Sequence, residues 1–346
     1  MMLLEITLLV VALVIILLSA ELFTNGIEWL GQRLQLSEGV VGSILAAVGT
    51  ALPETLIPIV AVVFFNQRHG NEVSIGAIAG APFMLSTLTF GLCGTAVLYF
   101  SQKGRRSQEL TINHTVLTRD LRFFILAFTI GMLCNWASDF AKYHLPYIMA
   151  FVLLGIYCLY LYKTLSHEGE IGQEPEKLYF DRLLKKGSNR LRFILPQILF
   201  GIAGIVGGAY LFVENLQDVA EAIGFPPLVL SLIICPIATE LPEKINSVLW
   251  IKAGKDTLAM GNITGALVFQ SCIPVAFGVA FTTWDLDLGT LITCITAVFS
   301  ASVILFLMNR RQLKFWNLMC CAVLYVIAVS ILLILDVAKN LGNALT

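Results

Sequence analysis

The sequence predicts an all-α polytopic membrane protein with ten transmembrane helices, arranged as two inverted repeats of five. Three observations predict this fold. Hydrophobic residues make up 58% of the 346 residues and charged residues only 13%, whereas a soluble domain carries about a quarter charged residues. Polar breaks divide the chain into ten apolar segments, and the second half of the chain repeats a pattern of the first.

Each apolar segment is long enough to cross a bilayer, which takes about 20 mostly apolar residues. The opening run MMLLEITLLVVALVIILLSA has no basic residue before its apolar core and continues into ELFTNGIEWL. We therefore interpret it as the first span and not as a signal peptide. The predicted spans are 3–30, 38–65, 72–100, 121–140, 145–165, 192–216, 225–251, 256–281, 287–308 and 314–338.

The distribution of basic residues predicts the orientation. Of the 22 Lys and Arg residues, 18 lie in loops that follow odd-numbered spans and 3 on the opposite side. Basic loops stay in the cytoplasm, so we expect both termini outside a cell membrane (plasma or inner). The predicted organisation is a first five-helix repeat over 1–165, a cytoplasmic linker over 166–191 and a second five-helix repeat over 192–346.

An internal repeat supports this division. Shifted by 189 residues, 22–54 aligns with 211–243 without a gap and with eight identities, four of them in a shared TxLPE cluster. After a shortening of four residues, GAIAGAPF (76–83) aligns with GNITGALV (261–268). Because each half has an odd number of spans, the halves are expected in opposite orientations. Such repeats place a binding site near the midplane, where discontinuous helices of the two halves meet.

The motifs GTALPE (49–54) and ATELPE (238–243) each set a proline and a glutamate inside an apolar segment. In a helix, Pro53 and Pro242 lack the N–H that would bond a carbonyl four residues back. Glu54 and Glu243 follow directly, and a carboxylate inside a membrane is a functional-site hypothesis by default. The carbonyls that the prolines free or loosen belong to Gly49, Thr50, Ala238 and Thr239.

Two carboxylates beside freed carbonyls predict a site for a hard cation. Ca²⁺ takes about 6–8 oxygen ligands, whereas the eight cysteines form no CxxC pair and have no metal-type spacing with the four histidines. A plainer alternative is that the prolines only kink helices and that each glutamate meets a neighbouring hydroxyl or lysine. The occurrence of the pattern at two repeat-related positions favours the cation site.

Three further polar residues are candidates for the site. Glu240 is either a third ligand or proton carrier, or the partner of Lys244 in an intrahelical ion pair, four residues apart on one face. The ion pair leaves a net charge that still suits one divalent cation. Asn262 and Gln270, eight residues apart, share one face of the eighth span, where they either reach the site or contribute to helix packing.

At these motifs the chain resembles the cation/calcium antiporter superfamily, the sodium/calcium exchangers and their relatives. The resemblance implies ten spans in inverted repeats, with Glu54 and Glu243 as central cation ligands and Thr50 and Thr239 contributing oxygen. Four departures from the family pattern bear on the mechanism. Pro82 and Leu267 stand where the family has sodium-binding Asn or Asp, and Ala51 and Glu240 replace the serine of the first motif.

The predicted function is secondary antiport of a divalent cation, with Ca²⁺ favoured, against H⁺ or Na⁺ by alternating access. The alternative is a cation channel or a divalent-cation uniporter that uses the same carboxylate pair. We expect no enzymatic activity, because the sequence lacks paired intramembrane aspartates and an aspartate-rich diphosphate motif. The expected partners are small inorganic cations and the lipid bilayer, with no organic cofactor, no nucleic acid and no obligate protein partner.

Overall fold

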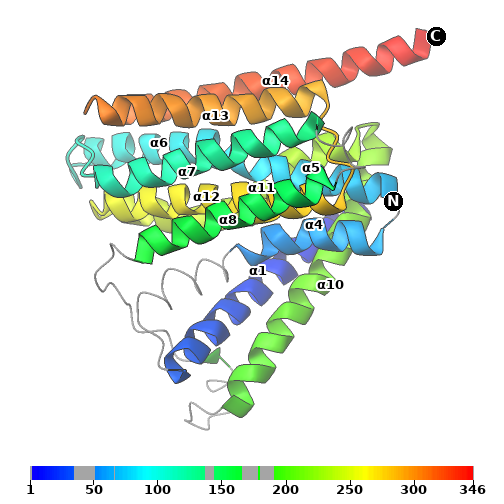
Figure 1. Ribbon diagram of the computed structural model, residues 1–346, viewed down its shortest axis with the longest axis horizontal. Helices are drawn as coiled ribbons and strands as arrows, with labels where there is room; N and C mark the ends of the chain where they lie inside the picture. Colours follow the sequence, from blue (N-terminus) through cyan, green and yellow to red (C-terminus); the bar gives the residue numbers. More distant parts are fainter. Residues whose placement is uncertain are drawn as a thin grey trace.

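The computed structural model describes residues 2–34, 51–65, 67–136, 144–165, 178–179 and 191–345. All the regular secondary structure of these residues is helical. Seven helical segments among them are long and apolar enough to cross a membrane, as expected for an integral membrane protein. The helices, shown in Figure 1, are α1 (Met2–Arg33), α4 (Leu52–Phe64), α5 (Gln67–Met84), η2 (Leu85–Thr89), α6 (Phe90–Gln102), α7 (His114–Leu133), η3 (Cys134–Trp136), α8 (Leu145–Leu165), α10 (Leu191–Ile223), α11 (Pro227–Lys252), α12 (Asp256–Phe281), α13 (Leu288–Asn309) and α14 (Phe315–Leu345).

A described helix overlaps each predicted span, but only seven described segments meet the length and hydropathy of a membrane span, so the count of ten stays a prediction. The predicted span 38–65 contains α4, and its first part up to residue 50 lies outside the described residues. α5, η2 and α6 form one continuous helical segment. α10 continues to Ile223, seven residues past the end predicted for 192–216, because its last turns are polar and hydropathy alone does not register them as helix.

α7 begins at His114, seven residues before the start predicted for 121–140. The cause is a side-chain cap. The Oδ1 atom of Asn113 accepts hydrogen bonds from the backbone N–H groups of Thr115 and Val116 at 3.0 and 3.3 Å. A cap of this kind begins a helix whatever the hydropathy of the first turn.

α12 and α5–α6 form the centre of the bundle, whereas α1 lies at its edge. Of the most apolar 18 residues of α12, 72% are buried, compared with 17% for α1. α5 packs closely on α11. A Cβ atom added to Gly76 would lie only 2.0 Å from Ser231 Oγ, and one added to Gly80 only 2.1 Å from the Leu232 carbonyl oxygen. The glycines of GAIAGAPF thus hold α5 against the helix that carries ATELPE.

The buried apolar residues form two separate clusters. The larger cluster is built from α5 to α8 and α11 to α14. The smaller one joins α1, α10 and α4, and it reaches the rest of the protein through residues such as Val73 and Ala77 of α5 and Cys235 of α11. In Figure 1, α1 and α10 lie side by side and run obliquely to the other helices. The α1–α10 pair is therefore a distinct packing unit against the remaining bundle.

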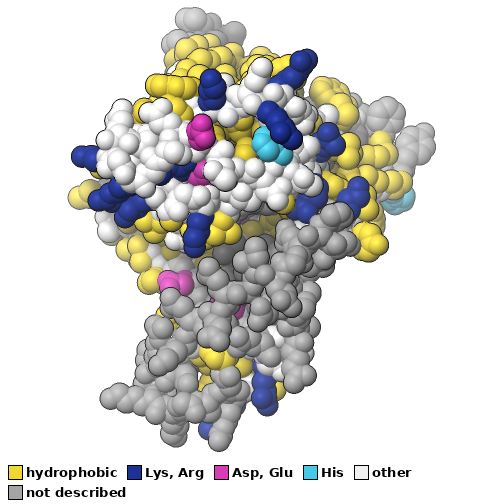
Figure 2. All heavy atoms as spheres, turned by 90° about the vertical axis from the view of Figure 1, so that its left-hand side faces the viewer, with side chains coloured by type: hydrophobic (Ala, Val, Ile, Leu, Met, Phe, Trp, Pro, Cys, Tyr) yellow, Lys and Arg dark blue, Asp and Glu magenta, His cyan; other side chains and the backbone are white. Residues whose placement is uncertain are grey.

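The two ends of the bundle differ in charge. Figure 2 shows Lys and Arg side chains gathered on the end that holds the turns between α6 and α7, α11 and α12, and α13 and α14. α1 begins and α14 ends toward the opposite end (Figure 1). The described basic side chains in these turns are Lys103, Arg105, Arg106, Lys252, Lys255, Arg310, Arg311 and Lys314.

Candidate cation-binding site

Glu54 lies in the first turn of α4, and its side chain is buried, with 7% of its surface exposed. It lines a cavity of about 10 Å³ inside the bundle. A cavity of roughly 10–15 Å³ holds one water molecule, so this space suits one water or one dehydrated ion. The other lining residues are Ile57, Ala77, Ala81, Cys235, Pro236 and Thr239.

The walls of this cavity come from both halves of the chain. Glu54 of the first motif shares the cavity with Thr239 of the second, and α5 closes it through residues of GAIAGAPF. The Thr239 hydroxyl donates to the Cys235 carbonyl oxygen at 2.9 Å, which leaves its own lone pairs as acceptors. A carboxylate and a hydroxyl oxygen are hard ligands of the kind that Ca²⁺ takes. The described part of the cavity can therefore contribute to a cation site.

Three predicted ligands lie outside the described residues. They are Gly49 and Thr50, which precede α4, and the side chain of Glu243. Among the residues that the structure describes, no group of three or more His, Cys, Asp or Glu side chains could hold a metal ion. The pairing of Glu54 with Glu243 therefore stays a prediction.

The expectation of a broken helix at both motifs is wrong for α11. This helix runs from Pro227 through Pro242 to Lys252 without interruption. Pro242 has no N–H to bond the Ala238 carbonyl, but the loss of that one bond does not end the helix, since the bonds on either side continue it. Pro53 is instead the second residue of α4. At the start of a helix the missing N–H costs no intrahelical hydrogen bond.

Of the two alternatives for Glu240, the structure shows the ion pair. The Lys244 Nζ atom lies 3.1 Å from Glu240 Oε2, and the two side chains are 1% and 2% exposed. Gln270 of α12 donates from Nε2 to the other carboxylate oxygen of Glu240 at 3.1 Å. Glu240 therefore faces α12, whereas Thr239 beside it faces the Glu54 cavity.

Asn262 and Gln270 lie on the same face of α12, as predicted, and this face packs on α11. The Asn262 side chain donates to Ser247 Oγ at 3.4 Å. The described residues that line the Glu54 cavity include neither of them. Their contacts fit helix packing, and a ligand role for either residue stays a prediction.

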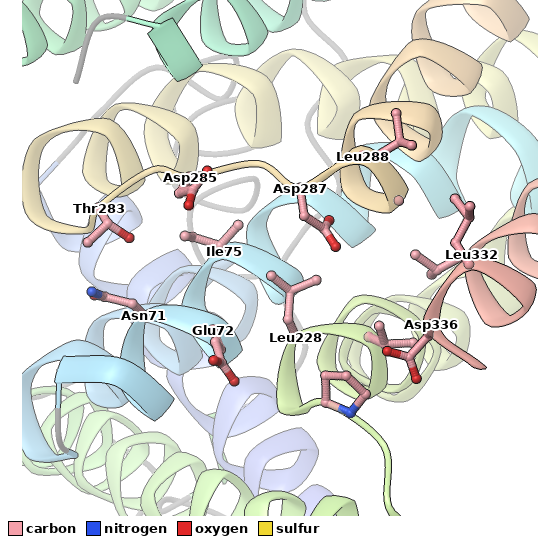
Figure 3. Close-up of a pocket in the computed structure, with 14 residues that line it drawn as sticks. Asn71, Glu72, Ile75, Leu228, Thr283, Asp285, Asp287, Leu288, Leu332 and Asp336 are labelled. Carbon is pink, nitrogen blue, oxygen red and sulfur yellow. The ribbon is translucent and has the colours of Figure 1, made fainter. Parts of the chain in front are cut away.

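A larger, acidic cavity of about 720 Å³ lies at the end of the bundle toward which α14 ends. Figure 3 shows Asp287 and Asp336 on one side of this acidic cavity, with Glu72 and Asp285 on the other. This cavity was not identified from the sequence, because Glu72 and Asp336 are far apart in the chain. The carboxylates come from α5, the α12–α13 connection and α14.

Asp120 of α7 is a buried carboxylate that sequence reasoning missed. It accepts a hydrogen bond from Thr264 Oγ1 at 2.8 Å and one from Arg119 Nε at 3.0 Å. Thr264 belongs to GNITGALV, so Asp120 ties α7 to the second-half copy of that motif. The sequence signal that could have identified it is the Arg119–Asp120 pair at the start of the apolar stretch of α7.

Comparison with known proteins agrees with this architecture. The profile of the family described as "Sodium/calcium exchanger protein" matches residues 4–165 and 193–334. The chain belongs to this family. Among curated relatives, it is 23% identical over 308 residues to the putative antiporter CaxA of Alkalimonas amylolytica, covering 87% of this chain and 88% of that one. It is 21% identical over 339 residues to the sodium/calcium exchanger MaX1 of Methanosarcina acetivorans, covering 92% and 95%.

The fold of this exchanger-family protein is similar to that of a solved exchanger. The crystal structure of the H⁺/Ca²⁺ exchanger CAX superposes with a TM-score of 0.70 at 16% identity, covering 96% of this chain and 87% of that chain. At this identity the match shows the fold alone.

Proposed function

We propose that this protein is a secondary active antiporter that exchanges a divalent cation, with Ca²⁺ favoured, across a membrane. The observation that carries the proposal is the buried Glu54 carboxylate, which shares a single-ion cavity with Thr239 from the other half of the chain. An ionisable residue buried inside a membrane-spanning bundle is a functional-site hypothesis by default. The complete proposed ligand set is Glu54, Glu243 and Thr239, with oxygens of Thr50, Gly49 and Ala238.

The division of the apolar core supports alternating access. The α1–α10 pair has its own packing cluster with α4, so it can shift against the main bundle without disrupting the larger core. In transporters built from repeats, access alternates largely by rigid-body movement of one unit against the other around a fixed site. We propose that α1 and α10 are the moving unit and that α4, α5, α11 and α12 hold the cation.

The proposal includes the membrane topology. Ten spans form two inverted repeats, 1–165 and 192–346, joined by a cytoplasmic linker over 166–191. The two stretches matched by the family profile, 4–165 and 193–334, support this division. The basic end of Figure 2 then faces the cytoplasm, and the acidic cavity and both termini face outward from the cell membrane.

The counter-ion is H⁺ or Na⁺, and the side chains favour H⁺. Pro82 and Leu267 stand at the positions where the resembled family has sodium-binding Asn or Asp, and neither has a side-chain oxygen. A carboxylate such as Glu54 can carry a proton in place of a metal ion. The transported ions are the only small-molecule partners in this proposal.

Ca²⁺ uptake into proteoliposomes under imposed H⁺ or Na⁺ gradients tests the proposal. We expect uptake that follows one of these gradients, that is accompanied by counter-flow of that ion, and that Glu54→Gln abolishes. Ca²⁺ uptake that depends on neither gradient, together with single-channel currents in a planar bilayer, would instead show that the protein is a channel that uses these carboxylates. Uptake unchanged in Glu54→Gln would remove Glu54 from the site.

A further inference from the structure

The ion pair between Glu240 and Lys244 lies deep in the bundle, beside the candidate cation site. Both side chains are almost fully buried, and the carboxylate also accepts a hydrogen bond from Gln270. Glu240 directly follows Thr239, a residue of the Glu54 cavity. The ammonium group of Lys244 is therefore held by the residue that directly follows Thr239 of the cavity.

The first half of the chain shows what this position looks like without the pair. The repeat alignment places Ala51 opposite Glu240 and Thr55 opposite Lys244. There the Thr55 hydroxyl donates to the Ala51 carbonyl oxygen at 2.9 Å, and no charge is involved. The second half thus differs from the first by a carboxylate and an ammonium group together, so its net charge is unchanged.

Stability does not explain the pair. Replacing a buried ion pair by apolar residues of similar volume is often neutral or even stabilising. The electrostatic requirement is more specific: the Glu240 carboxylate needs a positive charge beside it, and that charge can be a lysine or a mobile cation. Oxygen ligands for a mobile cation are present, because Oε1 of Gln270 is buried and accepts no hydrogen bond from the described residues.

We propose that Lys244 is a specificity-determining residue whose ammonium group acts as a tethered monovalent cation at Glu240. It fills from within the chain a position that would otherwise take up a mobile monovalent cation such as Na⁺. The consequence for transport rests on the proposed function. In each cycle the protein carries one monovalent cation fewer than it would if a mobile cation occupied this position. Removing the ammonium group creates a monovalent cation site from Glu240 and Gln270.

Thermal unfolding of the purified full-length protein in NaCl, with choline chloride keeping the ionic strength constant, tests this inference. In Lys244→Gln we expect saturable stabilisation by Na⁺, with the unfolding equilibrium constant falling roughly tenfold when Na⁺ is at ten times its Kd. Wild type and Lys244→Arg, which keep a cation at Glu240, are expected to lack this additional stabilisation, and the response of wild type to Na⁺ is the baseline for all variants. The double variant Glu240→Gln with Lys244→Gln is also expected to lack it, because the carboxylate is gone.

Three results would overturn the inference. The first is a Lys244→Gln protein that responds to Na⁺, K⁺ and Li⁺ no more than to choline. The second is an equal Na⁺ response in the double variant. The third is a Lys244→Gln protein that does not fold in any of these salts, whether or not the double variant folds. That result would show that a mobile cation does not replace the ammonium group. Protection of wild type by Ca²⁺, and its loss in Glu54→Gln, reports separately on the proposed function.

Discussion

The two copies of the Leu-Pro-Glu motif differ in their surroundings although they derive from one repeat. In the first copy, Pro53 lies at the start of α4, and the residues before Glu54 are uncharged. In the second copy, the proline lies within the continuous helix α11, and Glu240 and Lys244 form a buried ion pair around it. The repeat therefore preserves the motif while the charge next to it is rearranged.

The same asymmetry extends to the helices that pack on the motifs. The repeat alignment of GAIAGAPF with GNITGALV places Ala77 opposite Asn262, and its continuation places Leu85 opposite Gln270. Ala77 lines the Glu54 cavity, whereas Gln270 bonds Glu240. The first-half copy thus gives an apolar wall to the cavity, and the second-half copy supports the ion pair. The two repeat-related segments therefore contribute different side chains around the candidate site.

The largest expected effect comes from breaking the ion pair on one side only. Glu240→Ala or Lys244→Thr removes one member of the buried pair and leaves the other without the opposite charge 3.1 Å away. Breaking a buried pair in this way costs about 3–5 kcal/mol of folding free energy. The double variant Glu240→Ala with Lys244→Thr reproduces Ala51 and Thr55 of the first half, and we expect it to lose less than about 1 kcal/mol. Denaturant unfolding in a choline salt measures all three variants. Additive losses in the double variant would show that the two residues act independently.

The next effect is expected at Glu54, the glutamate of the first motif. Glu54→Gln removes a carboxylate that faces the cavity, and we expect Ca²⁺ affinity to fall about 100-fold or more, equivalent to roughly 2.7 kcal/mol. Calorimetric titration of the purified protein with Ca²⁺ measures the change. Glu221→Gln, which changes an exposed carboxylate at the end of α10, is the matched control and is expected to stay within about twofold. Equal losses in both variants would indicate a general charge effect and not a ligand.

Much of this fold could be predicted from the sequence, because a bilayer enforces helices of a given length and the hydropathy pattern records them. The differences arise where another force sets the boundary. The Asn113 cap begins α7 before the apolar stretch, and polar turns extend α10 to Ile223. Side-chain capping and amphipathic ends are invisible to a hydropathy criterion, so the sequence placed these boundaries too far inside.

The candidate site was predictable in part for a similar reason. The repeat pointed to Glu54 and Thr239, which line one cavity, and the four-residue spacing gave the pairing of Glu240 with Lys244 as one of two alternatives. The role of Gln270 could not be separated from packing, since one-dimensional spacing gives a helix face but not the residue opposite. Carboxylates brought together from distant helices, such as Glu72 with Asp336, have no local pattern at all.

A smaller effect is expected where the halves meet by backbone contact. Gly80→Ala places a Cβ atom against the Leu232 carbonyl oxygen, and such overpacking costs about 1–3 kcal/mol. Because α5 and α11 also form the Glu54 cavity, the same variant is expected to weaken Ca²⁺ binding. Gly207→Ala is the control, since a Cβ atom there meets nothing within 4 Å in the described structure. If both variants unfold at the same temperature as wild type, α5 and α11 are not held together by this contact.

The smallest effect is expected at the acidic cavity, which differs from the Glu54 cavity in being open to solvent. Asp285 is exposed at its rim, so its charge acts through a field that water and salt screen over about 10 Å at 0.1 M ionic strength. We expect Asp285→Asn to raise the KM for Ca²⁺ roughly twofold at low ionic strength and to leave it unchanged near 1 M salt. Initial rates of Ca²⁺ uptake at the two ionic strengths measure this. A higher KM that persists near 1 M salt would mean that Asp285 binds the ion directly. The acidic cavity would then act through direct ligands, as proposed for Glu54, and not through a field that salt screens.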